Sequence, residues 1–152
     1  AIALPDERWD KVDIKTTNLI PNILAQTKAE KKFAYTAMLF RDGICTEGAT
    51  SNVFAVKDGI LYTHPADNHI LKGITRQMIV TRVAPSLGIT LIEKEFDRAF
   101  VDDADELFFT DTIGGVIPII KLDKNPVSGG KPGHVTLRLR EALEKLMEEG
   151  LP

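Results

Sequence analysis

Short apolar runs alternate with turn residues along most of the chain, a pattern typical of β-strands joined by tight turns. The pairs Asp42-Gly43 and Asp58-Gly59 each lie between two such runs and predict hairpin turns. A further pair of runs is interrupted at Gly48. We therefore predict strands over 12–15, 35–41, 44–47, 51–57, 60–63, 89–96, 106–110 and 116–122.

Other segments carry helical signals instead. The predicted helices are 18–31, 74–84, 97–103 and 134–149. Thr16 and Thr17 offer N-caps to the first of them, and Pro21 is tolerated in its first turn. Pro85 and Gly88 signal the end of the second, and the last is amphipathic. Because the strands occur both in hairpins and between helices, the pattern favours a mixed α/β fold over a purely parallel sheet.

Length and composition fit one globular domain. The 152 residues are 43% hydrophobic with a formal net charge of −3, so the chain can bury a core and carries little self-repulsion. No internal repeat or linker follows residue 12, so we expect a lead over 1–11 and one domain over 12–152. The chain begins at Ala1 rather than at Met, which we interpret as processing or as the later part of a longer protein.

Charge and cysteine content argue against several classes of protein. A mildly acidic chain is not expected to bind nucleic acid, because phosphates attract a basic surface. The one cysteine, Cys45, cannot form an internal disulfide or build a multi-cysteine zinc site. No apolar stretch is long enough to cross a bilayer, and no leader-like segment opens the chain. We therefore expect a soluble cytoplasmic protein with no nucleic-acid or membrane partner.

The histidines do not predict a metal site. His64 and His69 share a polar loop, and neither has helical ligand spacing with His134. Two histidines on a loop are usually solvated side chains, so we expect no bound metal. The sequence also lacks the glycine-rich loops that bind nucleotides and the Gly-x-Ser-x-Gly motif of hydrolases.

Four places carry side chains suited to chemistry, although each also has an ordinary structural explanation. The loop-to-helix junction Gly73-Ile74-Thr75 offers amides and a hydroxyl to an anion, but a simple capped helix explains it equally. Thr110-Asp111-Thr112 gathers hydroxyls at a strand end. Glu47 lies in a strand, where glutamate is disfavoured unless it faces solvent or holds something. Lys15 closes a predicted strand and is ordinarily a surface charge.

Taken together, these segments resemble a known family. Four motifs occur in the order and spacing of the class IV aminotransferases, enzymes that use pyridoxal 5′-phosphate. They are Asp13-Ile14-Lys15-Thr16-Thr17-Asn18-Leu19, Thr46-Glu47-Gly48 with Ser51-Asn52-Val53-Phe54, Ile70-Leu71-Lys72-Gly73-Ile74-Thr75-Arg76, and Gly130-Lys131-Pro132-Gly133. The resemblance spans nearly the whole chain. Thr63-His64-Pro65-Ala66 and the Gly130–Gly133 turn make D-amino-acid aminotransferase the nearest member.

The resemblance implies a role for each matching residue. Lys15 would be the catalytic residue, forming a Schiff base with the cofactor and, once freed, moving a proton between substrate and cofactor. A desolvated lysine beside positive charge suits this role, because its neutral amine is a nucleophile. Glu47 would keep the pyridine nitrogen protonated. Leu71 would be an apolar residue that packs against the ring. The cofactor phosphate would be bound by Ile74, Thr75 and Thr112.

The resemblance also implies an architecture and an assembly. The chain would be the large C-terminal, cofactor-carrying domain of such an enzyme, a mixed sheet or pseudo-barrel with flanking helices. A missing N-terminal domain would supply an arginine for the phosphate and most groups that grip the substrate carboxylate. The protein would form a homodimer, with the cofactor cleft completed near the subunit interface.

The activity implied is transfer of an amino group from a D-amino acid to an α-keto acid. We expect the isolated chain to fold with weak or no transaminase activity, since the family's active site lies between two domains. Branched-chain transamination, aminodeoxychorismate lysis and a non-catalytic domain of the same fold remain alternatives. Asp111 and Ile113-Gly114-Gly115 depart from the family pattern, and an aspartate near a phosphate is unfavourable unless it points away or pairs with a cation.

Overall fold

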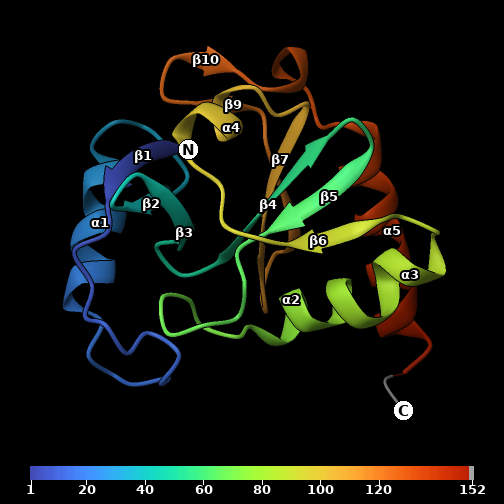
Figure 1. The fold of residues 1–152 in the computed structure, drawn as a ribbon, viewed down its shortest axis with the longest axis horizontal. Helices are drawn as coiled ribbons and strands as arrows, with labels where there is room; N and C mark the ends of the chain where they lie inside the picture. The colour runs from blue at the N-terminus through green and yellow to red at the C-terminus, as the bar shows by residue number, and fades with distance from the viewer. Residues whose placement is uncertain (151–152) are drawn as a thin grey trace.

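The computed structural model describes residues 1–150, and its strands form three sheets (Figure 1). Their strand orders are β1-β2-β3, β6-β5-β4-β7-β8 and β10-β9. The strands are β1 (Ile2–Pro5), β2 (Ala37–Arg41), β3 (Ile44–Gly48), β4 (Asn52–Lys57), β5 (Ile60–Thr63), β6 (Leu91–Glu93), β7 (Glu106–Asp111), β8 (Gly115–Ile119), β9 (Lys121–Leu122) and β10 (Asn125–Pro126). β1 pairs parallel with β2 and β5 with β6, whereas β2–β3, β4–β5, β4–β7 and β7–β8 are antiparallel. The predicted mixed fold is therefore confirmed.

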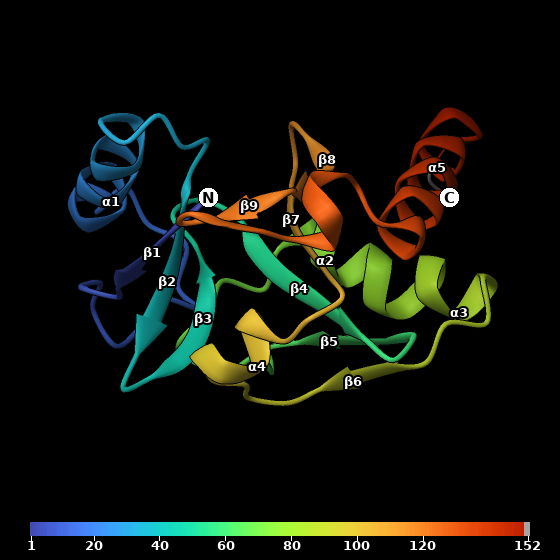
Figure 2. The same ribbon diagram turned by 90° about the horizontal axis from the view of Figure 1, so that it is seen from above.

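Helices flank the sheets on two sides. They are α1 (Ile20–Glu30), α2 (Ile74–Met78), α3 (Ala84–Ser86), α4 (Arg98–Asp102) and α5 (His134–Glu148), with a π turn (Ile79–Val83) joining α2 to α3 and a 3₁₀ turn at Ser128–Gly130. Figure 2 shows α1 beside the three-stranded sheet and α2, α3 and α5 at the opposite side of the molecule. Among residues 1–150, no helix combines the length and apolar character needed to span a membrane.

Both predicted hairpin turns are present. Asp42 and Gly43 have φ angles of 51° and 84° and link β2 to β3. Asp58 and Gly59 have φ angles of 50° and 75° and link β4 to β5. Positive φ at both central residues is typical of the type I′ turn, whose twist matches that of antiparallel strands. The local sequence therefore determines both turns.

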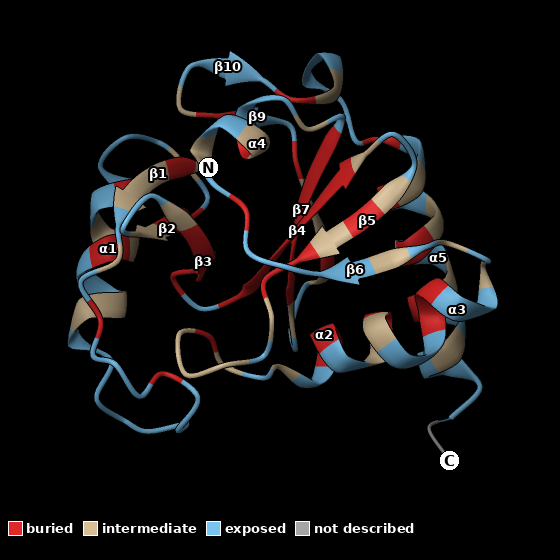
Figure 3. Ribbon diagram, in the orientation of Figure 1, coloured by how far each residue is buried: buried red, intermediate tan, exposed pale blue. Residues whose placement is uncertain are grey.

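The central strand β4 separates two apolar cores. Successive side chains of a strand point to opposite faces. Val53 and Ala55 join the core shared with β2, β3 and α4, whereas Phe54 and Val56 join the core beneath α2, α3 and α5. The Phe54 ring stacks on that of Phe108, with centroids 4.9 Å apart. Figure 3 shows the buried residues concentrated along β3, β4 and β7, which explains why the run over 51–57 is continuously apolar.

Several predicted boundaries are wrong. Residues 12–15 form bends and turns rather than a strand, because only the Val12 amide bonds to another segment, donating to the Asn68 carbonyl at 3.0 Å. The first helix begins at Ile20, and Thr16 does not cap it, since its hydroxyl accepts from the Asn18 amide instead. The predicted strand 89–96 is shortened to β6, and the run 116–122 is divided into β8 and β9.

The expected lead over 1–11 packs on the rest of the chain. Strand β1 pairs in parallel register with β2, and the Asp6 amide donates to the Phe40 carbonyl at 2.7 Å. Ile2 is buried with Ala29 and Leu39 between α1 and the three-stranded sheet. This segment therefore contributes both a strand and part of an apolar core.

A buried carboxylate anchors the start of α5. Glu106, on β7, accepts hydrogen bonds from the Val135 amide at 2.9 Å and from the Thr136 amide and hydroxyl at 2.8 and 2.7 Å. These amides belong to the first turn of the helix, which has no partner for them within the helix itself. A Cβ at Gly133 would lie 2.0 Å from Glu106 Cδ, so only glycine leaves room for this contact.

Replacing Glu106 with alanine should therefore lower the free energy of unfolding by about 1–3 kcal/mol, because three donors at the start of α5 lose their acceptor, two of them in the interior. Urea denaturation measures the change. Glu141→Ala is the matched control, since Glu141 is exposed on the same helix and should change stability by less than about 0.5 kcal/mol. Equal effects of the two substitutions would show that Glu106 does not anchor α5.

Candidate active site

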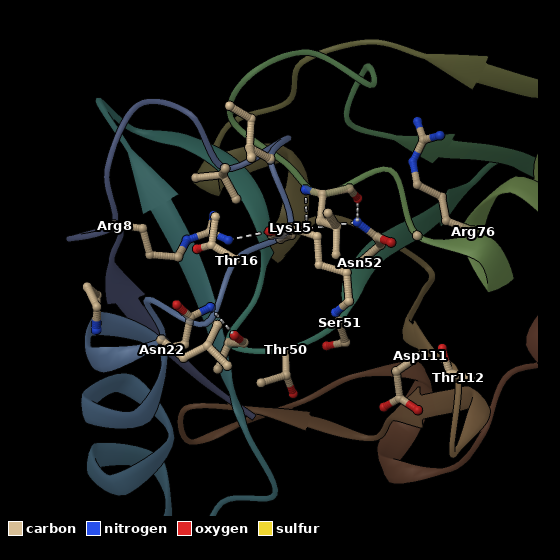
Figure 4. A pocket seen from close by; sticks show the side chains of 18 of the residues that line it. Arg8, Lys15, Thr16, Asn22, Thr50, Ser51, Asn52, Arg76, Asp111 and Thr112 are labelled. Carbon is tan, nitrogen blue, oxygen red and sulfur yellow. Dashed lines mark hydrogen bonds and ion pairs between the residues drawn. The ribbon is translucent and has the colours of Figure 1, made fainter.

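A cavity of about 470 Å³ lies between the segment preceding α1, the end of β3, the start of α2 and the end of β7. All of the catalytic and cofactor-binding residues expected from the sequence line it, namely Lys15, Glu47, Leu71, Ile74, Thr75 and Thr112. They come from parts of the chain almost a hundred residues apart (112 − 15 = 97), so the fold brings them together. Figure 4 shows Lys15 near the middle of the cavity, with Arg8 on one side and Arg76, Asp111 and Thr112 on the other.

Lys15 is exposed in this structure. It lies between the irregular segment over 12–14 and α1, which begins five residues later (20 − 15) at Ile20. The expectation of a desolvated amine at this position is therefore not met by residues 1–150. Exclusion of water from Lys15 requires atoms that this part of the chain does not supply.

Glu47 is buried, and both oxygens of its carboxylate accept hydrogen bonds. Only 4% of the residue is exposed, which rules out the solvent-facing position typical of a glutamate on a strand. One carboxylate oxygen accepts from Arg8 Nη1, and the other accepts from Asn52 Nδ2 at 2.8 Å and from the Leu71 amide at 3.1 Å. These bonds hold the carboxylate at one wall of the cavity.

Arg8 joins Glu47 to a second buried carboxylate. Its guanidinium binds Asp6 through Nε at 2.8 Å and through Nη2 at 2.7 Å, an arrangement that uses the planar fork of arginine. Asp6 also accepts from the Thr46 hydroxyl at 2.9 Å, and Arg41 Nη2 lies 3.6 Å from it. Two acidic and two basic side chains thus meet next to the cavity, so the buried charges compensate one another.

Burial and pairing act on the pKa of Glu47 in opposite directions. Burial is the larger effect and raises the pKa of Glu47 to about 7, although the charge and hydrogen bonds of Arg8 act to lower it. Burial also acts to raise the pKa of Asp6, but the hydrogen bonds and the charge of Arg8, with a hydrogen bond from Thr46, together outweigh it and leave that pKa below its ordinary value. Glu47 can therefore exchange a proton near neutral pH, whereas Asp6 stays ionised.

The start of α2 forms a second wall of the cavity. The first amides of a helix have no partner within it and favour an anion nearby. Ile74 and Thr75 occupy this position, and the Thr75 hydroxyl donates to the Asp111 carbonyl at 2.9 Å, which ties α2 to the end of β7. A Cβ at Gly73 would lie 2.3 Å from Asn52 Oδ1, so glycine lets the loop approach the amide that holds Glu47.

The end of β7 completes the cavity. The Thr110 hydroxyl is buried and has no hydrogen-bond partner within residues 1–150, so it can bond to a ligand. The carboxylate of Asp111 accepts from the Ile113 and Gly114 amides at 2.9 and 2.5 Å. The negative charge of Asp111, a residue that departs from the family pattern, is thus neutralised in part by the backbone amides of its own turn. Thr112 is exposed at the edge of the cavity.

The sequence pattern does not indicate a functional role for several residues that line this cavity. Arg8 lies in the expected lead, and no local pattern distinguishes it from a surface arginine. Asn52 and Arg76 stand within the recognised motifs, but neither was given a role. Arg76 is 2% exposed and donates to the His64 carbonyl at 2.7 Å and to Glu93 at 2.5 Å. Position within a motif was the one available signal for these two residues.

The family to which this chain belongs follows from a match to a protein-family model. A family model described as Amino-transferase class IV matches residues 2–122. The chain belongs to the class IV aminotransferases. The match begins within β1, so the residues over 2–11 that place Arg8 beside Glu47 are part of the family domain.

Individual relatives agree with this membership. The D-alanine aminotransferase of Staphylococcus aureus (strain COL) is 42% identical over 147 residues, which are 97% of this chain and 52% of that protein. A branched-chain aminotransferase from Thermoproteus uzoniensis, solved with norvaline, superposes with a TM-score of 0.84 at 30% identity, covering 95% of this chain and 50% of that one. An aminotransferase from Brucella abortus bound to the cofactor PLP gives a TM-score of 0.77 at 29% identity over 84% of this chain and 45% of that one. The class IV chain described here therefore spans about half the length of the curated relatives it matches.

Proposed function

We propose that this chain is the cofactor-carrying part of an aminotransferase that moves an amino group from a D-amino acid to an α-keto acid, using pyridoxal 5′-phosphate. The observation that carries the proposal is that Lys15 and Glu47 line one cavity together with the start of α2. The 42% identity to a D-alanine aminotransferase supports the D configuration. Branched-chain transamination is the second candidate, supported by the TM-score of 0.84 to a branched-chain enzyme.

The residues present fit this cofactor. Pyridoxal phosphate presents an aldehyde, a ring nitrogen and a phosphate, and the cavity offers the amine of Lys15, the carboxylate of Glu47 and the first amides of α2. The unpaired Thr110 hydroxyl adds a donor that the described residues leave unused. A volume of about 470 Å³ also lies in the usual range for small-molecule sites, about 300–1,000 Å³.

Each residue has a distinct part in the proposed reaction. The cofactor, when bound, supplies an electron sink that stabilises a carbanion at the substrate Cα. Lys15 would hold the cofactor through Nζ, and its amine would hold or move a proton at Nζ. Glu47 would hold a proton on the ring nitrogen, and its bonds to Arg8, Asn52 and Leu71 keep the carboxylate in place.

The amides of Ile74 and Thr75 would bind and orient the phosphate, and the hydrogen bond between Thr75 and Asp111 keeps α2 against β7. Leu71 would lie against the ring, and Thr112 would add a hydroxyl at the phosphate. Since Lys15 is exposed, we infer that the part of its relatives that this chain does not match covers the amine and excludes water. The isolated chain should therefore have weak or no transaminase activity. A cytoplasmic homodimer stays a prediction.

Reductive labelling tests the assignment of Lys15. The chain is incubated with pyridoxal phosphate, treated with borohydride to fix the cofactor to any lysine that holds it, and mapped by peptide mass. We expect one dominant labelled residue, Lys15, and loss of the label in Lys15→Ala. Lys11→Ala is the matched control, because Lys11 is exposed on the same segment but does not line the cavity. An unlabelled or randomly labelled chain would favour a non-catalytic domain of the same fold.

A further inference from the structure

Three side chains of types that commonly bind metals lie close together on the loop between β5 and α2, outside the cavity described above. His64, Asp67 and His69 each offer one ligand atom, and these atoms lie within 4.8 Å of one another. His64 is buried, with 2% of its side chain exposed, whereas Asp67 and His69 are 34% and 35% exposed. The expectation that both loop histidines are solvated is therefore wrong for His64.

The separations between these atoms suit a shared ion better than direct hydrogen bonds. His64 Nδ1 lies 3.8 Å from Asp67 Oδ1, and His69 Nδ1 lies 3.7 Å from Asp67 Oδ2. Both distances are too long for hydrogen bonds. Two ligands at about 2.1 Å from a tetrahedral zinc ion are about 3.4 Å apart. Small rotations of the partly exposed Asp67 and His69 side chains would therefore close the site.

The loop backbone is already held in place. Arg76 donates to the His64 carbonyl at 2.7 Å, and Arg8 donates to the His69 carbonyl at 3.2 Å. Within the loop, Asp67 accepts from the His69 amide at 2.8 Å, which fixes the turn that brings the two side chains together. An ordered loop loses little conformational entropy when an ion binds, so less of the binding free energy is spent on ordering.

The charge of Asp67 is not balanced by a permanent cation. Within residues 1–150, its ion-pair partners are His64 and His69, which are charged only when protonated. A divalent ion would supply the missing positive charge. His64 Nδ1 also lies 2.9 Å from the Pro65 carbonyl oxygen, so an ion at that nitrogen must displace the hydrogen of this contact.

We propose that His64, Asp67 and His69 bind one divalent transition-metal ion of the zinc class. Imidazole and carboxylate ligands suit Zn²⁺, Co²⁺ and Ni²⁺, and three protein ligands leave a coordination position for water. The ion adds a further link within the loop that leads to Leu71, whose amide donates to Glu47 at one wall of the cavity. The site is separate from the proposed cofactor chemistry, because none of its three residues lines that cavity.

Titration of the cofactor-free chain with Co²⁺, followed by visible absorption, tests the site, and calorimetry with Zn²⁺ gives the stoichiometry. We expect one saturable equivalent and a rise in melting temperature with Zn²⁺. His69→Ala should weaken binding by more than about 10-fold, since even residues that only orient metal ligands contribute this much. Asp67→Asn should act in the same direction and preserves the shape of the side chain.

The third histidine provides the control. His134 is exposed at the start of α5, so His134→Ala should leave Co²⁺ binding unchanged. Weak, non-saturating binding, or equal losses in His69→Ala and His134→Ala, would overturn the proposal. Circular dichroism verifies that each variant is folded. Reductive labelling of Lys15 is independent of this site, so failure of the metal proposal is distinguishable from failure of the proposed function.

Discussion

Replacing Arg8 with alanine should lower the free energy of unfolding by about 3–5 kcal/mol, the usual loss when one partner of a buried ion pair is removed. The Arg8 side chain is 3% exposed, and those of Asp6 and Glu47 are 0% and 6% exposed. Without the guanidinium, both carboxylates remain buried beside each other and lose several hydrogen bonds. The cost arises from uncompensated charge rather than from lost apolar packing.

Urea denaturation at pH 8 measures this effect. Arg82→Ala is the matched control, because Arg82 is an exposed arginine in a helical segment and should contribute less than about 0.5 kcal/mol. The double variant Arg8→Leu, Glu47→Gln should be more stable than Arg8→Ala, since it removes one unpaired charge and fills the space. A loss below about 1 kcal/mol in Arg8→Ala would contradict a structural role for this network.

The importance of Arg8 could not be predicted from its neighbours in sequence. Its partner Glu47 lies 39 residues away (47 − 8), and the contact depends on the parallel pairing of β1 with β2. Parallel pairing has no local signature comparable to the Asp-Gly pairs, which specify their turns within four residues. The local sequence around an arginine in a polar segment therefore does not indicate whether its side chain is buried or exposed.

Local signals predicted the elements that depend on local forces. The hairpin turns and α5 follow the expected bounds closely, since turn chemistry and amphipathic periodicity act over a few residues. Residues 12–15 have the composition of a strand but no neighbouring strand to pair with, so they form turns. Strand formation needs a partner, which composition does not reveal.

The candidate site likewise combines features that the local sequence predicts with contacts that only the fold creates. Each of Lys15, Glu47 and Thr75 has an ordinary explanation in isolation, and only the order of the four motifs predicted that they act together. Their convergence on one cavity is a property of the fold. The sequence predicts two solvated loop histidines, because the spacing of histidines along the chain does not report that His64 is buried.

The stability of the cofactor-free chain should fall as the pH rises from about 5 to 8 because of Glu47. Burial raises the pKa of Glu47 from 4.5 to about 7 in the folded chain. Between these values the folded state binds more protons than the unfolded state, so stability decreases with rising pH. One pKa unit corresponds to about 1.4 kcal/mol, so the loss attributable to Glu47 is roughly 3 kcal/mol. The loss begins near the unfolded pKa of 4.5 and levels off once the pH has risen past the folded pKa of about 7.

Comparison with Glu47→Gln isolates this contribution, since other titrating groups affect both proteins alike. Urea denaturation at a series of pH values should show a steeper decline for the unaltered chain than for Glu47→Gln between pH 5 and 8. Asp6 has a lowered pKa, so its effect has the opposite sign and falls below about pH 4, outside this window. Parallel curves for the two proteins would show that Glu47 is ionised throughout and that Arg8 outweighs burial.

The two predictions are linked through the same carboxylate. In Arg8→Ala, the remaining influences on Glu47 favour its neutral form even more strongly, because burial is no longer opposed by the guanidinium. Protonating Glu47 is inexpensive near pH 5 and costly at pH 8, so the loss caused by Arg8→Ala should grow with pH over this range. A constant loss would show that removing Arg8 leaves the protonation of Glu47 unchanged over this range.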